Sequence, residues 1–157
     1  MTIREYQPAD RQHVLHLLRL NTPRYFAPSE EKDLEYYLDH HAHHYFVVES
    51  GGELLGCGGF NFSDDGTVGK ISWDIFHPGH QGKGLGSALT RYRIDRLKEC
   101  DSVRTISVRT SQVAYQFYEK FGFRLREVVK DYWAEGFDLY RMDFPVESGP
   151  RHPAPGQ

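Results

Sequence analysis

The sequence has few of the features that mark several large classes of protein. Its 157 residues include two cysteines, Cys57 and Cys100, without metal-ligand spacing, so we expect reduced thiols and a cytoplasmic location. We find no signal peptide and no apolar run long enough to span a bilayer. The formal net charge of −3 gives no overall basic surface, so we expect neither nucleic acid nor a membrane as a partner.

The patterning is that of one globular domain. Residues 1–144 alternate between apolar-periodic segments and turn residues, and residues 145–157 are rich in proline and glycine. We therefore expect a single domain over 1–144 and a poorly ordered tail over 145–157.

Hydrophobic periodicity predicts the order β-α-α-β-β-β-α-β-α-β-β. The expected strands cover about 2–6, 45–49, 54–62, 67–76, 104–110, 123–133 and 137–144, and the expected helices about 10–20, 29–41, 85–100 and 111–121. Ser29 and Ser111 stand where N-caps would be. The fold class is therefore α+β, a mixed sheet with helices on both faces.

A glycine-rich loop, Gln81 to Ser87, lies between an expected strand and an expected helix. The glycines Gly82, Gly84 and Gly86 let backbone N–H groups turn toward one point, and the N-terminus of a helix carries a partial positive charge. Lys83 adds a point charge. The loop therefore predicts an anion site, with an ordinary tight turn as the alternative.

The spacing of the loop excludes two common phosphate loops. A Walker A loop needs Ser or Thr after Lys83, where the chain has Gly84, and a dinucleotide fingerprint needs Gly or Ala at the position of Leu89. The remaining pattern, Gln81-x-x-Gly84-x-Gly86, resembles the acyl-CoA pyrophosphate loop of the GNAT acetyltransferases.

A second motif carries much of the resemblance. Phe117-Tyr118-Glu119-Lys120, followed by Gly122-Phe123, resembles the Phe-Tyr-Glu-Lys-x-Gly-Phe segment of that family and follows the loop in the right order. The two motifs and the order of elements make residues 1–144 similar to a whole GNAT domain, with a mostly antiparallel sheet.

The resemblance implies that acetyl-CoA binds in a V-shaped opening between two splayed strands and passes its acetyl group directly to an amine. It implies that the backbone near Phe76 and His77 gives an N–H to the thioester carbonyl. The residues implied to contact acetyl-CoA are Phe76, His77, Gln81, Gly82, Lys83, Gly84, Leu85, Gly86, Ser87, Ser111 and Tyr118. Ser111 stands where the family often has an asparagine, so that contact would have a shorter reach.

Tyr118 occupies the position that, by the resemblance, protonates the leaving thiolate. A phenol near pKa 10 gives a proton to a thiolate near 8.5 at a cost of roughly 2 kcal/mol if neither is perturbed. The alternative is a core tyrosine, since Tyr118 shares a helical stripe with Ala114, Phe117 and Phe121.

The acceptor amine needs a general base, and the resemblance implies a carboxylate on the strand before the loop, where Asp74 stands. By a period of two, Lys70, Ser72, Asp74 and Phe76 share one face, and Trp73 and His77 the other. Asp74 is therefore our catalytic prediction beside Tyr118, with a salt-bridged strand residue as the alternative and His77 as a second base. The histidines at 40, 41, 43 and 44 have no convincing metal-ligand partners, so we expect no metal.

The resemblance implies that the first two helices and the last hairpin contact the acceptor, and these segments carry aromatic residues able to hold a cation. The alternative is an amphipathic helix together with an aromatic pair at the sheet edge. The predicted contacts are Tyr25, Phe26, Tyr36 and Trp133, with Tyr132 beside them and Glu30, Glu31 and Glu35 nearby in sequence. The predicted function is transfer of an acetyl group to a primary amine of a small molecule or peptide. The alternative is a non-catalytic acyl-CoA-binding module, and a homodimer is compatible with either.

Overall fold

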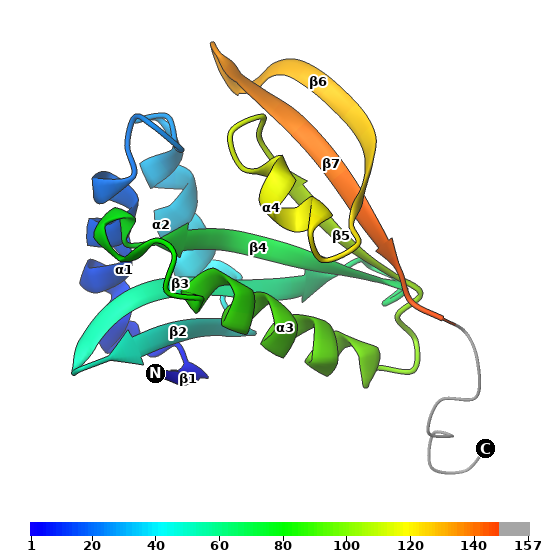
Figure 1. The fold of residues 1–157 in the computed structure, drawn as a ribbon, viewed down its shortest axis with the longest axis horizontal. Helices are drawn as coiled ribbons and strands as arrows, with labels where there is room; N and C mark the ends of the chain where they lie inside the picture. Colours follow the sequence, from blue (N-terminus) through cyan, green and yellow to red (C-terminus); the bar gives the residue numbers. More distant parts are fainter. Residues whose placement is uncertain (148–157) are drawn as a thin grey trace.

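The computed structural model describes residues 1–147, which form a seven-stranded sheet with helices on both faces (Figure 1). The strands are β1 (Thr2–Glu5), β2 (Tyr45–Ser50), β3 (Glu53–Phe62), β4 (Val68–Phe76), β5 (Thr105–Thr110), β6 (Arg124–Ala134) and β7 (Phe137–Pro145). The α-helices are α1 (Arg11–Leu20), α2 (Glu30–His40), α3 (Leu85–Lys98) and α4 (Tyr115–Glu119), with short 3₁₀ turns η1 (Pro8–Asp10) and η2 (Pro78–His80). The predicted order of elements and the α+β class are confirmed.

The sheet order is β1-β2-β3-β4-β5-β7-β6, and every neighbouring pair is antiparallel except β4 and β5. β2, β3 and β4 follow one another as the predicted meander, which delivers the chain to the glycine loop. The single parallel pair needs a crossover, and the loop with α3 forms it.

Two apolar cores lie on opposite faces of the sheet. On one face, Leu89 and Leu97 of α3 pack with Phe46, Ile71 and Ile106 of the strands. The core of the other face joins α1 and α2 to the sheet through Val14, Leu18, Leu34, Val47 and Ile75. Alternate residues of β2 therefore enter different cores, as the period of a strand requires.

The strands β4 and β5 pair only over their first halves. Their register runs from Val68 opposite Thr105 to Ile71 opposite Val108 and then stops. Beyond this point the β5-β7-β6 half leaves the β1-to-β4 half, and α4 lies beside the opening (Figure 1). The strand pair is thus splayed, as the resemblance implied.

A bulge at Trp73 reverses the faces of β4. Gly58 lies opposite both Trp73 and Asp74, and Trp73 has a φ of 50°. Ile71 and Ile75 consequently enter opposite cores. The prediction that Lys70, Ser72, Asp74 and Phe76 share a face is therefore wrong: Lys70 and Ser72 lie on the α1/α2 face, and Asp74 and Phe76 lie on the α3 face.

The helix predicted from Ser111 is much shorter than expected. Residues 111–114 form a turn in which the Ser111 carbonyl accepts hydrogen bonds from the N–H groups of Ala114 and Tyr115, and α4 starts only at Tyr115. Neither Ser29 nor Ala114, the residue that precedes α4, makes a side-chain cap hydrogen bond. Ser29 is thus the N-cap residue of α2 as predicted, without a side-chain hydrogen bond, whereas the N-cap prediction for Ser111 is wrong because α4 starts only at Tyr115.

The last strand continues past residue 144, where the sequence led us to expect the tail to begin. Pro145 is the last residue of β7, and the Val146 N–H donates to the Arg104 carbonyl while its side chain is buried. The rest of the expected tail, from residue 148 on, lies outside the described residues. Within residues 1–147, no helix is long and apolar enough to cross a membrane, and no group of three His, Cys, Asp or Glu side chains could hold a metal ion.

Candidate active site

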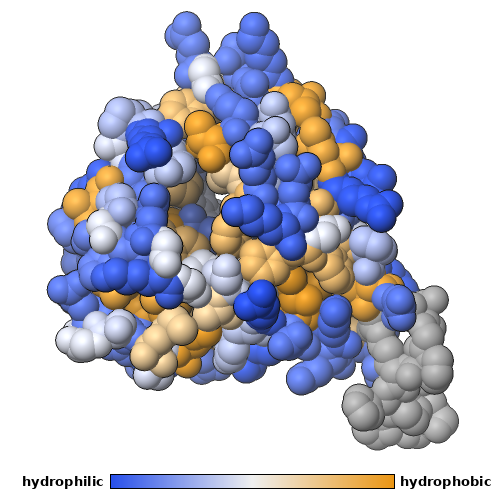
Figure 2. Space-filling model, in the orientation of Figure 1, coloured by the Kyte–Doolittle hydropathy of each residue, from blue (hydrophilic) through white to orange (hydrophobic). Residues whose placement is uncertain are grey.

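A cavity of about 1110 Å³ opens between the splayed strands. It is lined by most of β4, the glycine loop, the end of β5, the turn before α4 and the aromatic residues of the α1–α2 connection. Figure 2 shows a hollow near the middle of this face of the molecule. A cavity of this size is at the upper end of the range for small-molecule sites.

The glycine loop forms one end of the cavity. Gly82 and Gly84 have φ angles of 80° and 78°, a conformation that residues with a Cβ rarely adopt. The first helical hydrogen bond of α3 runs from the Ala88 N–H to the Gly84 carbonyl, so the N–H groups of the preceding residues have no acceptor within the helix. The loop therefore has the backbone geometry of an anion site at the start of a 14-residue helix.

The predicted cofactor residues of this loop do not all reach the cavity. Gln81, Gly82, Gly84, Leu85, Gly86 and Ser87 line it, and Ser111 lines it from the turn before α4. The Lys83 ammonium instead lies 3.2 Å from Nδ1 of His80, beside the neighbouring hairpin. A Cβ on Gly86 would lie 3.2 Å from the Phe117 ring, so that glycine also allows the close packing of α3 against α4.

The backbone of β4 offers one N–H to the cavity. The His77 N–H donates to the Leu55 carbonyl, and the His77 ring accepts from the Gly79 N–H. Because successive N–H groups of a strand point to opposite edges, the Phe76 N–H points to the splayed side, away from β3. The Phe76 carbonyl accepts a 2.9 Å hydrogen bond from the side-chain amide of Asn21, the residue that follows α1. Of the two predicted positions, the geometry favours Phe76.

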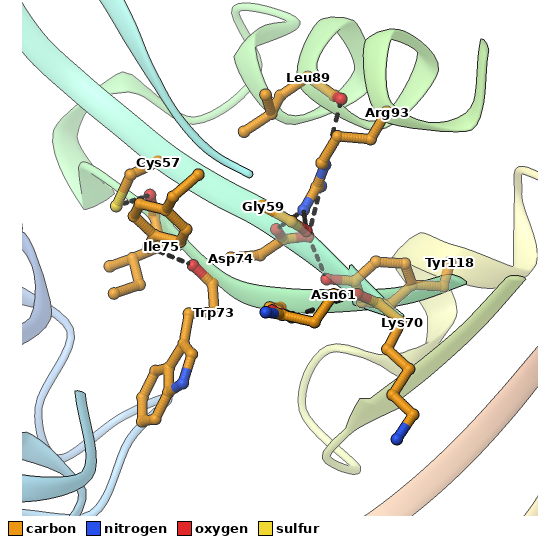
Figure 3. A network of polar contacts seen from close by, with 12 residues as sticks. Cys57, Gly59, Asn61, Lys70, Trp73, Asp74, Ile75, Leu89, Arg93 and Tyr118 are labelled. Carbon is orange, nitrogen blue, oxygen red and sulfur yellow. Dashed lines mark hydrogen bonds and ion pairs between the residues drawn. The ribbon is translucent and has the colours of Figure 1, made fainter. Parts of the chain in front are cut away.

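Asp74 lies between Arg93 and Tyr118 at the bottom of the opening and accepts hydrogen bonds from both (Figure 3). Arg93 reaches down from α3 and donates from both terminal nitrogens to the Asp74 carboxylate, with 2.8 Å between Nη2 and Oδ2. Arg93 also donates to the carbonyls of Leu89 and Gly59. The Tyr118 hydroxyl donates to Oδ2 of Asp74 at 2.5 Å.

This triad is almost completely withdrawn from water. The Arg93 side chain is 0% exposed and that of Asp74 is 9% exposed. Burial, and then the nearby Asp74 carboxylate, raise the pKa of Tyr118 well above 10. The cost of proton transfer from this phenol is therefore larger than the unperturbed values indicate. A Cβ on Gly58 would lie 2.2 Å from Oδ1 of Asp74, so a residue with a side chain would not fit at this position of β3.

The acceptor residues predicted from the sequence separate into two groups. Tyr25, Phe26 and Trp133 line the cavity, with Phe26 stacked on Trp73 at 6.1 Å between ring centroids. Tyr36 is 60% exposed and packs on His40 and His41, away from the cavity, and the adjacent Tyr37 lines the cavity instead. The prediction for Tyr36 is wrong because neighbouring positions of α2 point about 100° apart.

Trp133 reaches the cavity through an irregular part of β6. The pairing of β6 with β7 shifts between Val129 and Ala134, which leaves residues 130–133 outside the ladder. The Trp133 indole N–H then donates to the Thr110 carbonyl of β5 at 3.2 Å. This irregular segment brings an aromatic ring from the sheet edge over the end of β5.

Charged residues that sequence reasoning did not assign to the site also line the cavity, among them Glu30, Lys70 and Arg109. Glu30, at the start of α2, is buried, and its carboxylate accepts a hydrogen bond from the Ala27 N–H at 2.7 Å. Burial raises the pKa of Glu30 despite this bond. Lys70 of β4 and Arg109 of β5 line the cavity from the sheet. Glu31, by contrast, pairs with Arg19 at 2.9 Å.

The splayed sheet and the glycine loop beside it are the features expected of an acyltransferase domain. Residues 14–123 match the model of the acetyltransferase (GNAT) family. This match covers more than half of the chain, and the chain therefore belongs to the GNAT family of acetyltransferases. No curated protein matches the sequence.

Solved structures share the fold over nearly the whole chain. The ribosomal-protein-S18-alanine N-acetyltransferase of Escherichia coli has a TM-score of 0.78 at 19% identity, covering 98% of both chains. An aminoglycoside 6'-N-acetyltransferase complexed with coenzyme A has a TM-score of 0.75 at 17% identity, covering 96% of this chain and 100% of that one. YncA from Salmonella typhimurium, solved with its cofactor acetyl-CoA, has a TM-score of 0.72 at 21% identity, covering 99% of this chain and 97% of that one. At these identities the likeness shows the fold alone, and the first two of these enzymes are named for different acceptors, a ribosomal protein and an aminoglycoside.

Proposed function

We propose that the protein transfers an acetyl group from acetyl-CoA to a primary amine of a small molecule or peptide. The observation that carries the proposal is the continuous cavity between β4 and β5, which has the glycine loop at one end and aromatic side chains at the other. The proposal is tested by calorimetric titration with acetyl-CoA, which should bind with one site per chain. Absence of binding would contradict it.

The residues of the cavity fit acetyl-CoA. Gly82 and Gly84 and the free N–H groups of the first turn of α3 suit its pyrophosphate, and the unpaired edge of β4 beyond Ile71 suits its pantetheine arm. When bound, acetyl-CoA would supply the thioester that the amine attacks. The Phe76 N–H lies on that edge and would donate a hydrogen bond to developing negative charge on oxygen, a contribution of about 3 to 4 kcal/mol in comparable sites.

Asp74 is proposed as the residue that orients Tyr118 and not as the base. Its carboxylate already accepts hydrogen bonds from Arg93 and Tyr118, which fits the salt-bridged alternative for this strand position. Tyr118 lines the cavity, and its hydroxyl holds the proton that the leaving sulfur would take up. The bond to Asp74 fixes that hydroxyl at the bottom of the opening.

Replacing Tyr118 by phenylalanine should leave acetyl-CoA binding within about twofold of wild type. It should lower kcat by roughly 100-fold, since a positioned acid contributes about 100- to 10,000-fold and water can replace part of its role. Calorimetry and the rate of CoA thiol release measure the two effects separately. A kcat equal to that of wild type would assign Tyr118 to the core.

Glu30 is the proposed general base. A lysine-like amine is neutral in only about one molecule in 2,500 at pH 7, a penalty of roughly 4.6 kcal/mol, so a base near the acceptor matters. Glu30 and Asp74 are the carboxylates among the residues that line the cavity, and Asp74 is held by Arg93. Burial raises the pKa of Glu30, which makes its carboxylate a stronger base than an exposed one.

Glu30→Gln separates this role from a structural one, because the glutamine oxygen can still accept from the Ala27 N–H. We expect kcat/KM to fall at least about 100-fold while acetyl-CoA binding is unchanged. Wild-type activity should rise with pH through the raised pKa of Glu30, and that limb of the pH profile should vanish in the variant. The limb set by the amine itself should remain.

The contribution of Glu30 to the free energy of unfolding should fall as the pH rises, whereas the activity should increase. A carboxyl group whose pKa is raised by folding stabilises the native state below its unfolded pKa and loses this contribution as the pH rises through the folded value. Glu30→Gln should therefore be no less stable than wild type at neutral pH.

An unchanged pH profile of kcat/KM in Glu30→Gln would rule out Glu30 as the base.

A further inference from the structure

Three cations lie on the face of the sheet that forms the acceptor end of the cavity. Lys70 of β4 is opposite Ser107 of β5, two residues before Arg109, and Arg109 is opposite Arg141 of β7. All three line the cavity. Figure 3 shows Lys70 and Trp73 extending from β4 to the side opposite Arg93. The face opposite α3 is thus basic where the acceptor would bind.

The three cations differ in their counter-ions. Arg141 is neutralised, with Nε 3.2 Å from a Glu127 oxygen and Nη1 3.1 Å from an Asp143 oxygen. Neither Lys70 nor Arg109 has a carboxylate oxygen within 4.0 Å among the residues that the structure describes. Two positive charges therefore face the cavity without an anionic partner in residues 1–147.

Arg109 is held in place by aromatic rings. Its guanidinium carbon lies 5.0 Å from the centroid of Tyr132 and 5.9 Å from that of Trp133, and Nη2 donates to the Tyr132 hydroxyl at 2.6 Å. This aromatic pair, which the sequence suggested for a cationic acceptor, is thus occupied by a cation of the protein itself. A guanidinium fixed in this way presents a rigid set of donors, the arrangement that suits a carboxylate.

The acids of the cavity do not offer an alternative site for a second positive charge. Asp74 is bound to Arg93 on the other face of the sheet, and Glu30 is assigned to the reacting amine. A polyamine or an aminoglycoside would therefore place an extra ammonium group near Lys70 and Arg109, where like charges repel it.

We infer that the acceptor is a small amine that also carries a carboxylate group, such as an amino acid. Lys70 and Arg109 bind the carboxylate, and the amine is directed toward Glu30 and the Phe76 N–H. The inference rests on the proposed function, because it names the class of acceptor for the same reaction. It also predicts that amines which differ only by a carboxylate differ strongly as substrates.

The test compares pairs of amines that differ by that one group: ornithine with putrescine, lysine with cadaverine, and histidine with histamine. CoA thiol release is measured for each at equal concentration and pH. We expect kcat/KM for the carboxylated member of at least one pair to exceed that of its partner by at least about tenfold. A hydrogen bond to a charged group strengthens binding by about this factor or more. Faster release with the decarboxylated members would overturn the inference and leave the proposed function intact.

Substitutions of Lys70 and Arg109 test whether these two residues cause the preference for carboxylated amines. Lys70→Met and Arg109→Met should each raise KM for the preferred carboxylated amine by about tenfold with little change in kcat, and so reduce the discrimination within each pair. Lys32→Met, which removes an exposed lysine of α2 outside the cavity, is the matched control and should behave as wild type. Unaltered discrimination in both cavity variants would contradict the inference. Failure of wild type to release CoA with any amine would overturn the proposed function together with it.

Discussion

Acetyl-CoA should bind at least about 100-fold more weakly to Gly84→Val than to wild type. Gly84 has a φ of 78° and immediately precedes α3, and a β-branched residue there is strained by about 1 to 3 kcal/mol. Relief of this strain rotates the peptide groups of the loop, so hydrogen bonds to a charged ligand, worth about 1.5 to 3 kcal/mol each, are lost as well. Calorimetric titration with acetyl-CoA measures the loss.

Gly66→Val provides the matched control. Gly66 has a φ of 76° and lies in the turn before β4, at the opposite end of that strand from the loop. A Cβ there would lie 3.5 Å from the Ser102 hydroxyl, an ordinary contact. Gly66→Val should therefore carry a similar backbone strain and bind acetyl-CoA as wild type does. Equal binding by Gly84→Val and Gly66→Val would contradict the assignment of the loop.

Asp74→Ala should lower the free energy of unfolding by about 3 to 5 kcal/mol. The substitution leaves the fully buried Arg93 guanidinium without its counter-ion, and an uncompensated buried charge is costly. Urea unfolding, followed by circular dichroism, measures the change. A loss below about 1 kcal/mol, typical of an exposed ion pair, would contradict the structural role of the triad.

The double variant Asp74→Ala/Arg93→Met distinguishes a buried ion pair from two independent residues. Once Asp74 is absent, removal of Arg93 also removes the unpaired charge, so the double variant should be less destabilised than the sum of the two single variants. Additive losses would show that the two side chains do not depend on each other. If Asp74 acted only as a base, Asp74→Ala would lower activity, but its effect on the free energy of unfolding would not depend on Arg93.

The sequence predicts the fold well because its strongest signals are local. The meander, the glycine loop and α3 follow from turn residues and periodicity, and the element order agrees with the structure throughout. The faces of β4 could not be predicted by counting alternate residues. The bulge at Trp73 depends on the register with β3, which is a contact between distant parts of the chain.

The sequence analysis did not assign Arg93 or Arg109 to the site. Arg93 had one available signal: it lies between Leu89 and Leu97 on the buried stripe of α3, where an arginine requires a buried partner. That partner, Asp74, reaches the α3 face only because of the bulge. Arg109 gave no such signal, because its ring contacts with Tyr132 and Trp133 depend on the irregular pairing of β6.

The central claim is tested most directly by the release of CoA thiol from acetyl-CoA with wild-type protein, in the presence and absence of the three pairs of amines. The account predicts release that depends on the amine and is fastest with a carboxylated one. Binding of acetyl-CoA without any amine-dependent release would contradict the account and favour a non-catalytic acyl-CoA-binding role for this fold.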